Sequence, residues 1–309
     1  MTEDRLANPS VARRLSSVLW LPYEPRTAWL LLAPVMTVLA GVTVFPILYS
    51  LYVSFFSLKL TRPLRVPFVG LGNYVDVVQQ DIFWVAVSRT VVFTVVSVIA
   101  VAVIALLIAL LLDQTFRGRR LLGALLLVPW AIPSVANGLM WKWIYDSHYG
   151  ALNGVLLQAG IIRHYLAWLG DPAKTLLLIA NAFVWKEVPL AAILILVTMK
   201  SIPEDLYKAA TVDGANRPQR FLHVTLPSLR PGFMLVVVYV AMVAIRQFDL
   251  IFILTEGGPA DASHVMSWQI YVETFRNLSF GTGAALSYIL AIATFALAYF
   301  VIRALGQRL

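Results

Sequence analysis

The chain has 309 residues, of which 60% are hydrophobic and only 13% are charged, with a net charge of +8 at pH 7. Soluble domains carry roughly one-quarter charged residues, so lipid rather than water is the expected solvent. Cysteine is absent and the four histidines are scattered, which excludes disulfides and thiolate chemistry and argues against a zinc site.

Residues 1–27 form a basic N-terminal segment, predicted to be cytoplasmic, ahead of the first long apolar run. That run is longer than the core of a signal peptide, so we expect an uncleaved first membrane span. Within the segment, residues 11–20 alternate basic and apolar side chains. We expect this stretch either to lie along the membrane surface or to form a disordered tail.

Six apolar stretches reach the roughly 20 residues that a helix needs to cross the hydrocarbon core of a bilayer. They cover about residues 28–54, 85–112, 121–142, 175–198, 231–254 and 283–303. The sequence therefore predicts an all-α integral membrane protein with a transmembrane domain over residues 28–309. Pro129 and Pro133 in the third span and Pro189 in the fourth are expected to bend those helices, because each removes a backbone donor.

Lysine and arginine are unevenly distributed between the connections on the two sides of the membrane. The N-terminus, residues 113–120, residues 199–230 and the C-terminus together carry twice as many as the opposite connections. The positive-inside bias therefore predicts that both termini are cytoplasmic. The net charge follows from this topology and from contact with anionic lipid, and no basic and aromatic pattern indicates nucleic acid as a partner.

The longest predicted cytoplasmic loop, residues 199–230, carries the signals of two short helices. Pro203 followed by two acidic residues is a helix start, and Gly214 suits the left-handed conformation that ends a helix. Pro218 starts a second segment that closes at Leu226 and Pro227. The alternative is an ordinary amphipathic loop lying on the membrane.

The string EDLYKAATVDGANRPQRFLHVTLP, residues 204–227, resembles the EAA loop of permeases of binding-protein-dependent ATP-binding-cassette importers, especially the carbohydrate-uptake class of the maltose permease subunits. The positions at the family's spacing are Ala209, Ala210, Asp213, Gly214, Ala215, Phe221, Leu226 and Pro227. Lys208 departs from the family, which has an acidic residue there. The stretches FVGLGNY, residues 68–74, and TEGGP, residues 255–259, fit the same class, so the resemblance covers nearly the whole chain.

This resemblance implies a type I importer permease fold in the cytoplasmic (inner) membrane of a bacterium. It also implies that the loop is a coupling helix docked on a separate ATPase, through Glu204, Asp205, Lys208, Ala209, Ala210, Asp213 and Gly214. The expected partners are a second permease subunit, two ATP-binding-cassette ATPase subunits, an extracytoplasmic solute-binding protein, membrane lipid and the solute. The chain has no G-x-x-x-x-G-K-[ST] phosphate loop, so ATP and Mg are expected on the ATPase subunits and no cofactor on this chain.

Polar side chains inside the predicted spans mark a candidate solute pathway, because such groups are costly in lipid and usually face a cavity or one another. In the fifth span, Tyr239, Met242, Arg246 and Asp249 recur on one face of a continuous helix. Aromatic faces combined with amides and charges suit a sugar. The candidate solute-binding residues are Trp130, Asn137, Asn181, Trp185, Glu187, Tyr239, Arg246, Gln247 and Asp249.

Alternatives stay open for these residues. Arg246 and Asp249 could simply neutralise each other, and Lys186 and Glu187 could pair with the second permease subunit. Tryptophans near the span ends could be interfacial anchors. A glycerol phosphate or another small anion is the alternative cargo, with Lys186 and Arg246 as its partners.

Two other classes of membrane protein fit the sequence less well. A membrane-embedded enzyme would need carboxylates or histidines at catalytic spacing, whereas the acids within the spans sit beside basic residues. An ion-coupled secondary transporter would usually show two matched halves with broken helices, and no internal repeat is found. The sequence thus predicts a permease subunit, without enzymatic activity of its own, that moves a sugar or sugar-like solute by alternating access.

Overall fold

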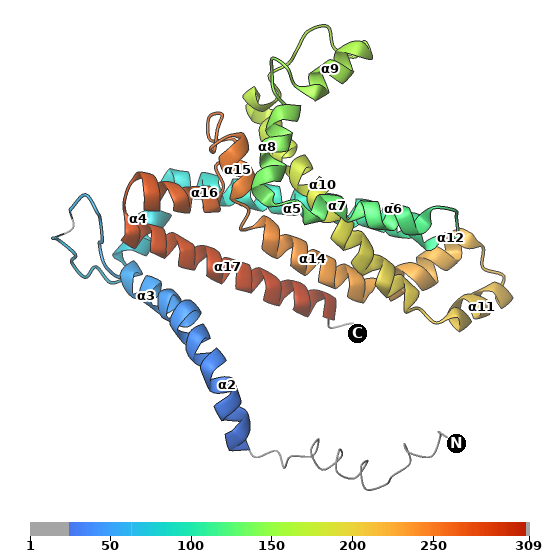
Figure 1. Cartoon of the computed structure of the whole chain (residues 1–309), viewed down its shortest axis with the longest axis horizontal. Coiled ribbons are helices and arrows are strands. Elements are labelled where there is room, and N and C mark those ends of the chain that lie inside the picture. The colour runs from blue at the N-terminus through green and yellow to red at the C-terminus, as the bar shows by residue number, and fades with distance from the viewer. Residues whose placement is uncertain (1–24, 63, 307–309) are drawn as a thin grey trace, which may run out of the picture. The chain divides into compact units, whose positions relative to one another are not determined.

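A computed structural model of the chain describes residues 25–62 and 64–306 (Figure 1). The basic and apolar stretch at residues 11–20 lies outside the described residues. The chain divides into two compact units, Met1–Tyr52 and Val53–Leu309. The helices are α2 (Pro25–Leu39), η1 (Ala40–Val44), α3 (Phe45–Ser54), α4 (Gly72–Val78), α5 (Asp81–Asp113), α6 (Arg119–Leu126), α7 (Val128–Ala131), α8 (Ser134–Ile144), α9 (Ala151–Gln158), η2 (Trp168–Gly170), α10 (Pro172–Lys200), α11 (Glu204–Val212), α12 (Arg217–Arg220), η3 (Phe221–Thr225), α13 (Leu226–Ser228), α14 (Arg230–Ala244), α15 (Asp249–Leu254), α16 (Met266–Tyr271), η4 (Val272–Arg276) and α17 (Phe280–Gly306).

The N-terminal unit holds most of the first predicted span. Helix runs through Trp29–Ser54, with a π-helical turn between α2 and α3. This run is apolar and long enough to cross a membrane, and none of its most apolar window is buried within the chain. A helix of this kind satisfies its own backbone polar groups, which is the requirement for a span surrounded by hydrocarbon.

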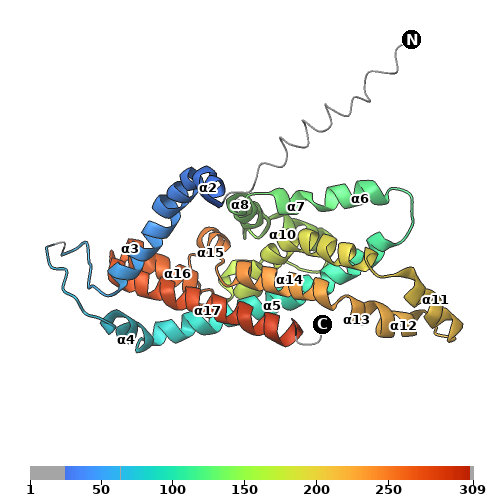
Figure 2. The same cartoon turned by 90° about the horizontal axis from the view of Figure 1, so that it is seen from below.

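The second unit is built on four long helices, α5, α10, α14 and α17. α10 packs along α5, α14 packs against both, and α17 packs on α14 (Figure 1, Figure 2). At the centre, the rings of Phe93 on α5 and Phe183 on α10 meet edge to face, with centroids 5.4 Å apart. Gly232 of α14 faces Thr198 of α10 so closely that a Cβ would lie 2.5 Å from the threonine Oγ1. Small residues let membrane helices approach in this way.

The third predicted span is broken rather than continuous. The helices on either side of Ile132 and Pro133 meet at 95°. Pro133 has no N–H to continue the helix, and Ile132 before it takes an extended conformation with ψ 129°. Trp130 on α7 and Asn137 on α8, both predicted in the third span, therefore lie on different helices on either side of this break.

The fifth predicted span is also not one helix. α14 ends at Ala244, residues 245–248 are not helical, and α15 begins at Asp249. At its other end α14 meets the preceding helical segment at 58°. The described residues thus contain four unbroken helices suited to cross a membrane, and six spans if each bent pair counts as one.

The connection between α8 and α10 folds around Asn153, whose side chain is fully buried. Its Nδ2 donates to the carbonyl oxygens of Asp146 and Leu166, and its Oδ1 accepts from the Leu166 N–H and from Trp168 Nε1. At the start of the same connection, hydrogen bonds from the backbone N–H groups of His148 and Tyr149 hold the pKa of the Asp146 carboxyl below its ordinary value. This connection is therefore an ordered structure.

The loop at residues 199–230 has the two predicted helical segments. α11 starts directly after Pro203, and the chain leaves it through Gly214, which has a φ of +79°. The second segment begins at Arg217, one residue before Pro218, and continues through a π-helical turn to Ser228. Side chain and backbone of Asn216 and Gln219 form a reciprocal capping box at its start.

Candidate functional site

The first candidate site is the surface of α11, which stands at the end of the second unit away from α4 and α16 (Figure 1, Figure 2). None of its residues is buried, and the apolar side chains of Leu206 and Val212 are 47% and 88% exposed. Lys208 forms an ion pair of 2.9 Å with Asp205, which lies three residues earlier on the same helix. α11 therefore presents exposed apolar side chains and paired charges in water.

α11 is tied to the segment that follows it. The hydroxyl groups of Tyr207 and Thr225 are 3.0 Å apart, and Arg220 donates to Thr211 Oγ1 at 3.1 Å. These bonds join α11 to α12 and η3, so the two segments form one unit. This unit leads through α13 directly to the start of α14.

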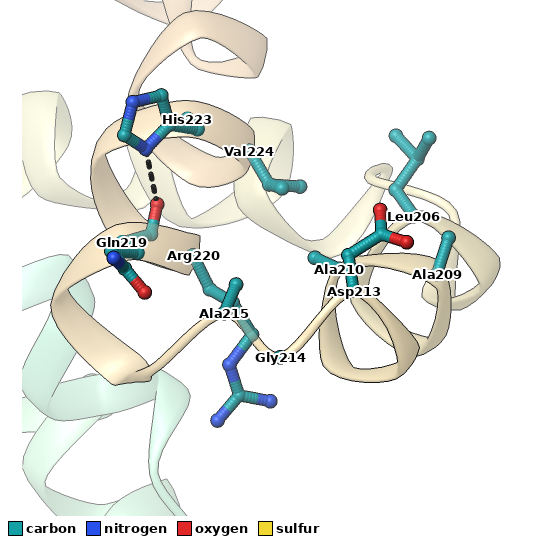
Figure 3. Close-up of a pocket in the computed structure, with 10 residues that line it drawn as sticks. All are labelled: Leu206, Ala209, Ala210, Asp213, Gly214, Ala215, Gln219, Arg220, His223 and Val224. Carbon is teal, nitrogen blue, oxygen red and sulfur yellow. Dashed lines mark hydrogen bonds between the residues drawn. The ribbon is translucent and has the colours of Figure 1, made fainter.

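A hollow of about 540 Å³ lies between these segments (Figure 3). Figure 3 shows Leu206, Ala209 and Asp213 on the α11 side, Gly214 in the connection, and His223 and Val224 on the other wall. The His223 ring nitrogen Nδ1 bonds the carbonyl oxygen of Gln219 at 2.9 Å. The hollow is lined by Leu206, Ala209, Ala210, Asp213, Gly214, Ala215, Gln219, Arg220, His223 and Val224.

 Four of the seven predicted coupling residues thus line the hollow, namely Ala209, Ala210, Asp213 and Gly214. The other three, Glu204, Asp205 and Lys208, lie outside it on α11.

The second candidate site is a chain of polar side chains inside the spans. The Tyr239 hydroxyl on α14 donates to Glu187 Oε2 on α10 at 2.8 Å, and Trp130 Nε1 on α7 lies 3.5 Å from the same hydroxyl. Lys186 Nζ pairs with the other carboxylate oxygen of Glu187 at 3.5 Å. Glu187 is only 2% exposed, so its charge is balanced by these neighbours rather than by water. Three of the predicted solute-binding residues thus meet here, although they come from three different helices.

A second polar group joins α8 and α10. Asn181 Nδ2 donates to the Tyr145 hydroxyl at 2.9 Å, and the rings of Trp141 and Trp185 meet edge to face with centroids 6.0 Å apart. Asn137 is fully buried and donates to the Ala182 carbonyl oxygen at 3.2 Å. Asn137, Asn181 and Trp185 therefore lie along the contact between these two helices, as polar residues inside a membrane protein are expected to do.

Arg246, Gln247 and Asp249 fall at the break between α14 and α15, and no hydrogen bond or ion pair in the described part of the chain joins them to Glu187 or Tyr239. The Arg246 side chain donates to the Met242 carbonyl oxygen in the last turn of α14. Within the described residues it forms no ion pair with Asp249. The prediction that Arg246 and Asp249 share a helical face with Tyr239 is wrong, because the helix that would carry this face ends at Ala244.

The structure adds three residues to these groups that were not among the predicted solute-binding residues. Lys186 completes the charge pair with Glu187, while Trp141 and Tyr145 contact Trp185 and Asn181. Trp141 on α8 and Tyr145, the residue directly after its end, are four residues apart, which is a signal that sequence inspection can find. Their partners on α10 could not be found in that way, because the spacing says nothing about which helix lies opposite.

A family model described as binding-protein-dependent transport system inner membrane component matches residues 101–309. The match covers more than half of the chain and includes both candidate sites. The chain therefore belongs to this family, and it is the inner-membrane permease subunit of a binding-protein-dependent importer.

Several curated proteins are similar to the chain over most of its length. The trehalose/maltose transport system permease protein MalF of Thermococcus litoralis is 34% identical over 265 residues, covering 85% of this chain and 88% of that protein. The sulfoquinovosyl glycerol transport system permease protein SmoG of Agrobacterium fabrum is 34% identical, covering 88% of each chain. The lactose transport system permease protein LacF of Rhizobium radiobacter is 30% identical, covering 93% of this chain and 96% of that protein.

A solved structure has the same fold. A chain of a bacterial ABC transporter involved in the import of the acidic polysaccharide alginate matches with a TM-score of 0.78 and 21% identity, covering 91% of this chain and 96% of that chain. A second structure of an alginate ABC transporter, in complex with an alginate pentasaccharide-bound periplasmic protein, matches with a TM-score of 0.76. These matches support the type I importer permease fold that the sequence predicts.

Proposed function

We propose that this chain forms half of the translocation pathway of an ATP-driven importer for a sugar or sugar-like solute. The observation that carries the proposal is the contact of Trp130, Tyr239 and Glu187, which groups two aromatic rings, a hydroxyl and a carboxylate within the spans. Sugars present apolar faces that stack on aromatic rings and hydroxyls that need paired donors and acceptors. The relatives include permeases of trehalose/maltose and lactose transport systems, which supports the same class of cargo.

A small anion such as glycerol phosphate is the second candidate cargo. It would need cations free to pair with it. Lys186 is already paired with Glu187, and Arg246 is exposed at the break after α14. The pairing of Lys186 thus leaves Arg246 as the available one of the two cations that a phosphate would use, which makes the anion the second candidate.

We further propose that α11 and the connection through Gly214 dock on a separate ATPase subunit. Exposed Leu206 beside the small Ala209 and Ala210 suits close contact with another protein, and Asp213 supplies a charge at the rim. The sequence has no phosphate loop of its own, so ATP and Mg would bind to the ATPase subunits. A second permease subunit and a solute-binding protein complete the assembly that we propose.

The test of the cargo is ATP hydrolysis by the whole transporter in lipid nanodiscs, with the solute-binding protein and a panel of sugars, polyols and glycerol phosphates. Stimulation by one sugar supports the proposal and names the cargo. Stimulation by a glycerol phosphate alone would contradict it in favour of the anion.

The test of the docking surface is co-purification of the ATPase with this chain. Asp213→Arg reverses the charge at the rim of the hollow and is expected to reduce co-purification. Asp76→Arg, at an exposed position of α4, makes the same change at a site away from α11 and is the matched control. Equal ATPase recovery from both variants would contradict the proposal.

A further inference from the structure

The short connection between α5 and α6 carries three arginines within four residues. Arg117 and Arg120 are exposed and Arg119 is half-buried. Within the described residues, none of the three side chains forms a hydrogen bond or an ion pair with another group. The nearby acid does not compensate them, because Asp113 is paired with Lys200 at 2.5 Å. This connection therefore presents a local excess of positive charge.

Apolar side chains stand next to these arginines. Phe116 before them is 40% exposed, and Leu121 and Leu125 after them are 64% and 57% exposed. They belong to or border α6, the first half of a bent pair of helices suited to span a membrane. The arginines thus lie at the start of this bent pair, with exposed apolar side chains before and after them in the chain.

The connection also borders an open hollow of about 600 Å³, lined by Thr115, Phe116, Gly118, Arg119, Arg120 and Leu121. A left-handed Gly118, with a φ of +89°, turns the chain at this hollow. Arg119 and Arg120 after the turn line the hollow, and exposed Arg117 lies one residue before the turn. A second hollow begins one residue earlier, where Gln114 lies with Arg217 and Arg220 of α12. The basic surface therefore continues toward the loop that carries α11.

We propose that Arg117, Arg119 and Arg120 form a binding site for the headgroup of an anionic phospholipid. A guanidinium group presents a planar fork of donors that matches phosphate oxygens, and it binds them by charge as well as by hydrogen bonds. The exposed Phe116, Leu121 and Leu125 would contact the acyl chains of the same lipid. A soluble acidic partner would leave these apolar side chains unexplained, and the side predicted to be cytoplasmic is the one where anionic lipids lie. This site is independent of the proposed cargo.

The test uses the intact transporter, extracted from vesicles of phosphatidylcholine and phosphatidylglycerol, with bound lipid measured by native mass spectrometry. The triple variant Arg117→Gln, Arg119→Gln, Arg120→Gln is expected to lower bound phosphatidylglycerol by about fivefold or more. The matched control is Lys59→Gln, Arg62→Gln, Arg65→Gln, which removes the same charge from the connection predicted to be on the other side. An equal effect in the control, or no effect in the triple variant, would overturn the proposal.

Three further arms separate lipid binding from other causes. Replacement of the same arginines by lysine keeps the charge and is expected to retain most of the bound phosphatidylglycerol, which excludes misfolding as the cause of its loss. Displacement of the lipid by excess inorganic phosphate would assign the site to a free anion instead. Loss of the ATPase subunits from the triple variant in phosphatidylcholine alone would assign it to a protein contact. Either of the last two results would overturn the lipid assignment.

Discussion

The hydroxyl group of Tyr239 donates a 2.8 Å hydrogen bond to Glu187, a carboxylate that is 2% exposed and lies 52 residues earlier in the chain. The bond joins α14 to α10 at the point where Trp130 of α7 also approaches. A buried carboxylate needs such donors, because a charge without partners is costly away from water.

Tyr239→Phe removes the hydroxyl and keeps the ring. The proposed function places Tyr239 and Glu187 at the solute site, and a hydrogen bond to a charged group contributes about 1.5–3 kcal/mol. We therefore expect loss of this bond to disturb the site and raise the apparent KM for the solute by about tenfold or more. Transport by proteoliposomes over a range of solute concentrations measures this change. Tyr299→Phe, on the exposed face of α17, is the control. An unchanged KM with a lower melting temperature would show that the bond only stabilises the fold.

Gly214→Val places a branched side chain at a φ of +79°, where L residues are strained by roughly 1–2 kcal/mol. No atom lies within 4 Å of the added Cβ, so the change acts on the direction of the chain between α11 and α12. We expect solute-stimulated ATP hydrolysis to fall by about tenfold while the spans stay folded. Gly160→Val has the same open surroundings and a φ of +71°, in another connection, so it should leave the coupling intact. Equal losses in both variants would contradict a specific role for the loop.

Gly232→Ala introduces a Cβ against Thr198, where α14 crosses α10. Overpacking of this kind costs about 1–3 kcal/mol, and we expect a lower melting temperature. Thr198→Gly removes the side chain that would be struck and is expected to restore part of the loss in the double variant. Thermal unfolding of both single variants and the double variant measures the coupling between them. Strictly additive effects would show that the two helices do not meet at these residues.

Asn153→Ala removes four hydrogen bonds that hold the connection between α8 and α10. Each buried group left without a partner costs about 1–3 kcal/mol, so we expect faster hydrogen exchange at residues 146–168. Exchange within α5 should stay unchanged, because that helix makes none of these bonds. Unchanged exchange at residues 146–168 would contradict the role of Asn153.

The long helices could be predicted from sequence because a span must be apolar over its whole length and must satisfy its own backbone. The predictions 85–112, 175–198 and 283–303 fall within α5, α10 and α17. The break at Pro133 carries a visible signal in the sequence. The break at residues 245–248 carries none, since it contains neither proline nor glycine.

Tertiary contacts explain this second break. Ser267 Oγ donates to the Gln247 carbonyl oxygen at 2.6 Å, so a polar group that the helix leaves free finds a partner. The ring of Phe248 packs against Trp268 and Tyr271. These partners lie about twenty residues further along the chain, and helical periodicity cannot anticipate them.

The sequence by itself determined that the chain is a membrane protein, where its long helices lie, and the family to which its loop at residues 204–227 belongs. Composition and local spacing carry that information, because they reflect the solvent and the backbone. Only the tertiary structure decided that Glu187 meets Tyr239 and Trp130, and that Arg246 and Asp249 stand apart from them. The physical reason is that contacts between helices depend on how the helices pack and where they break. The spacing of residues along one helix specifies neither of these.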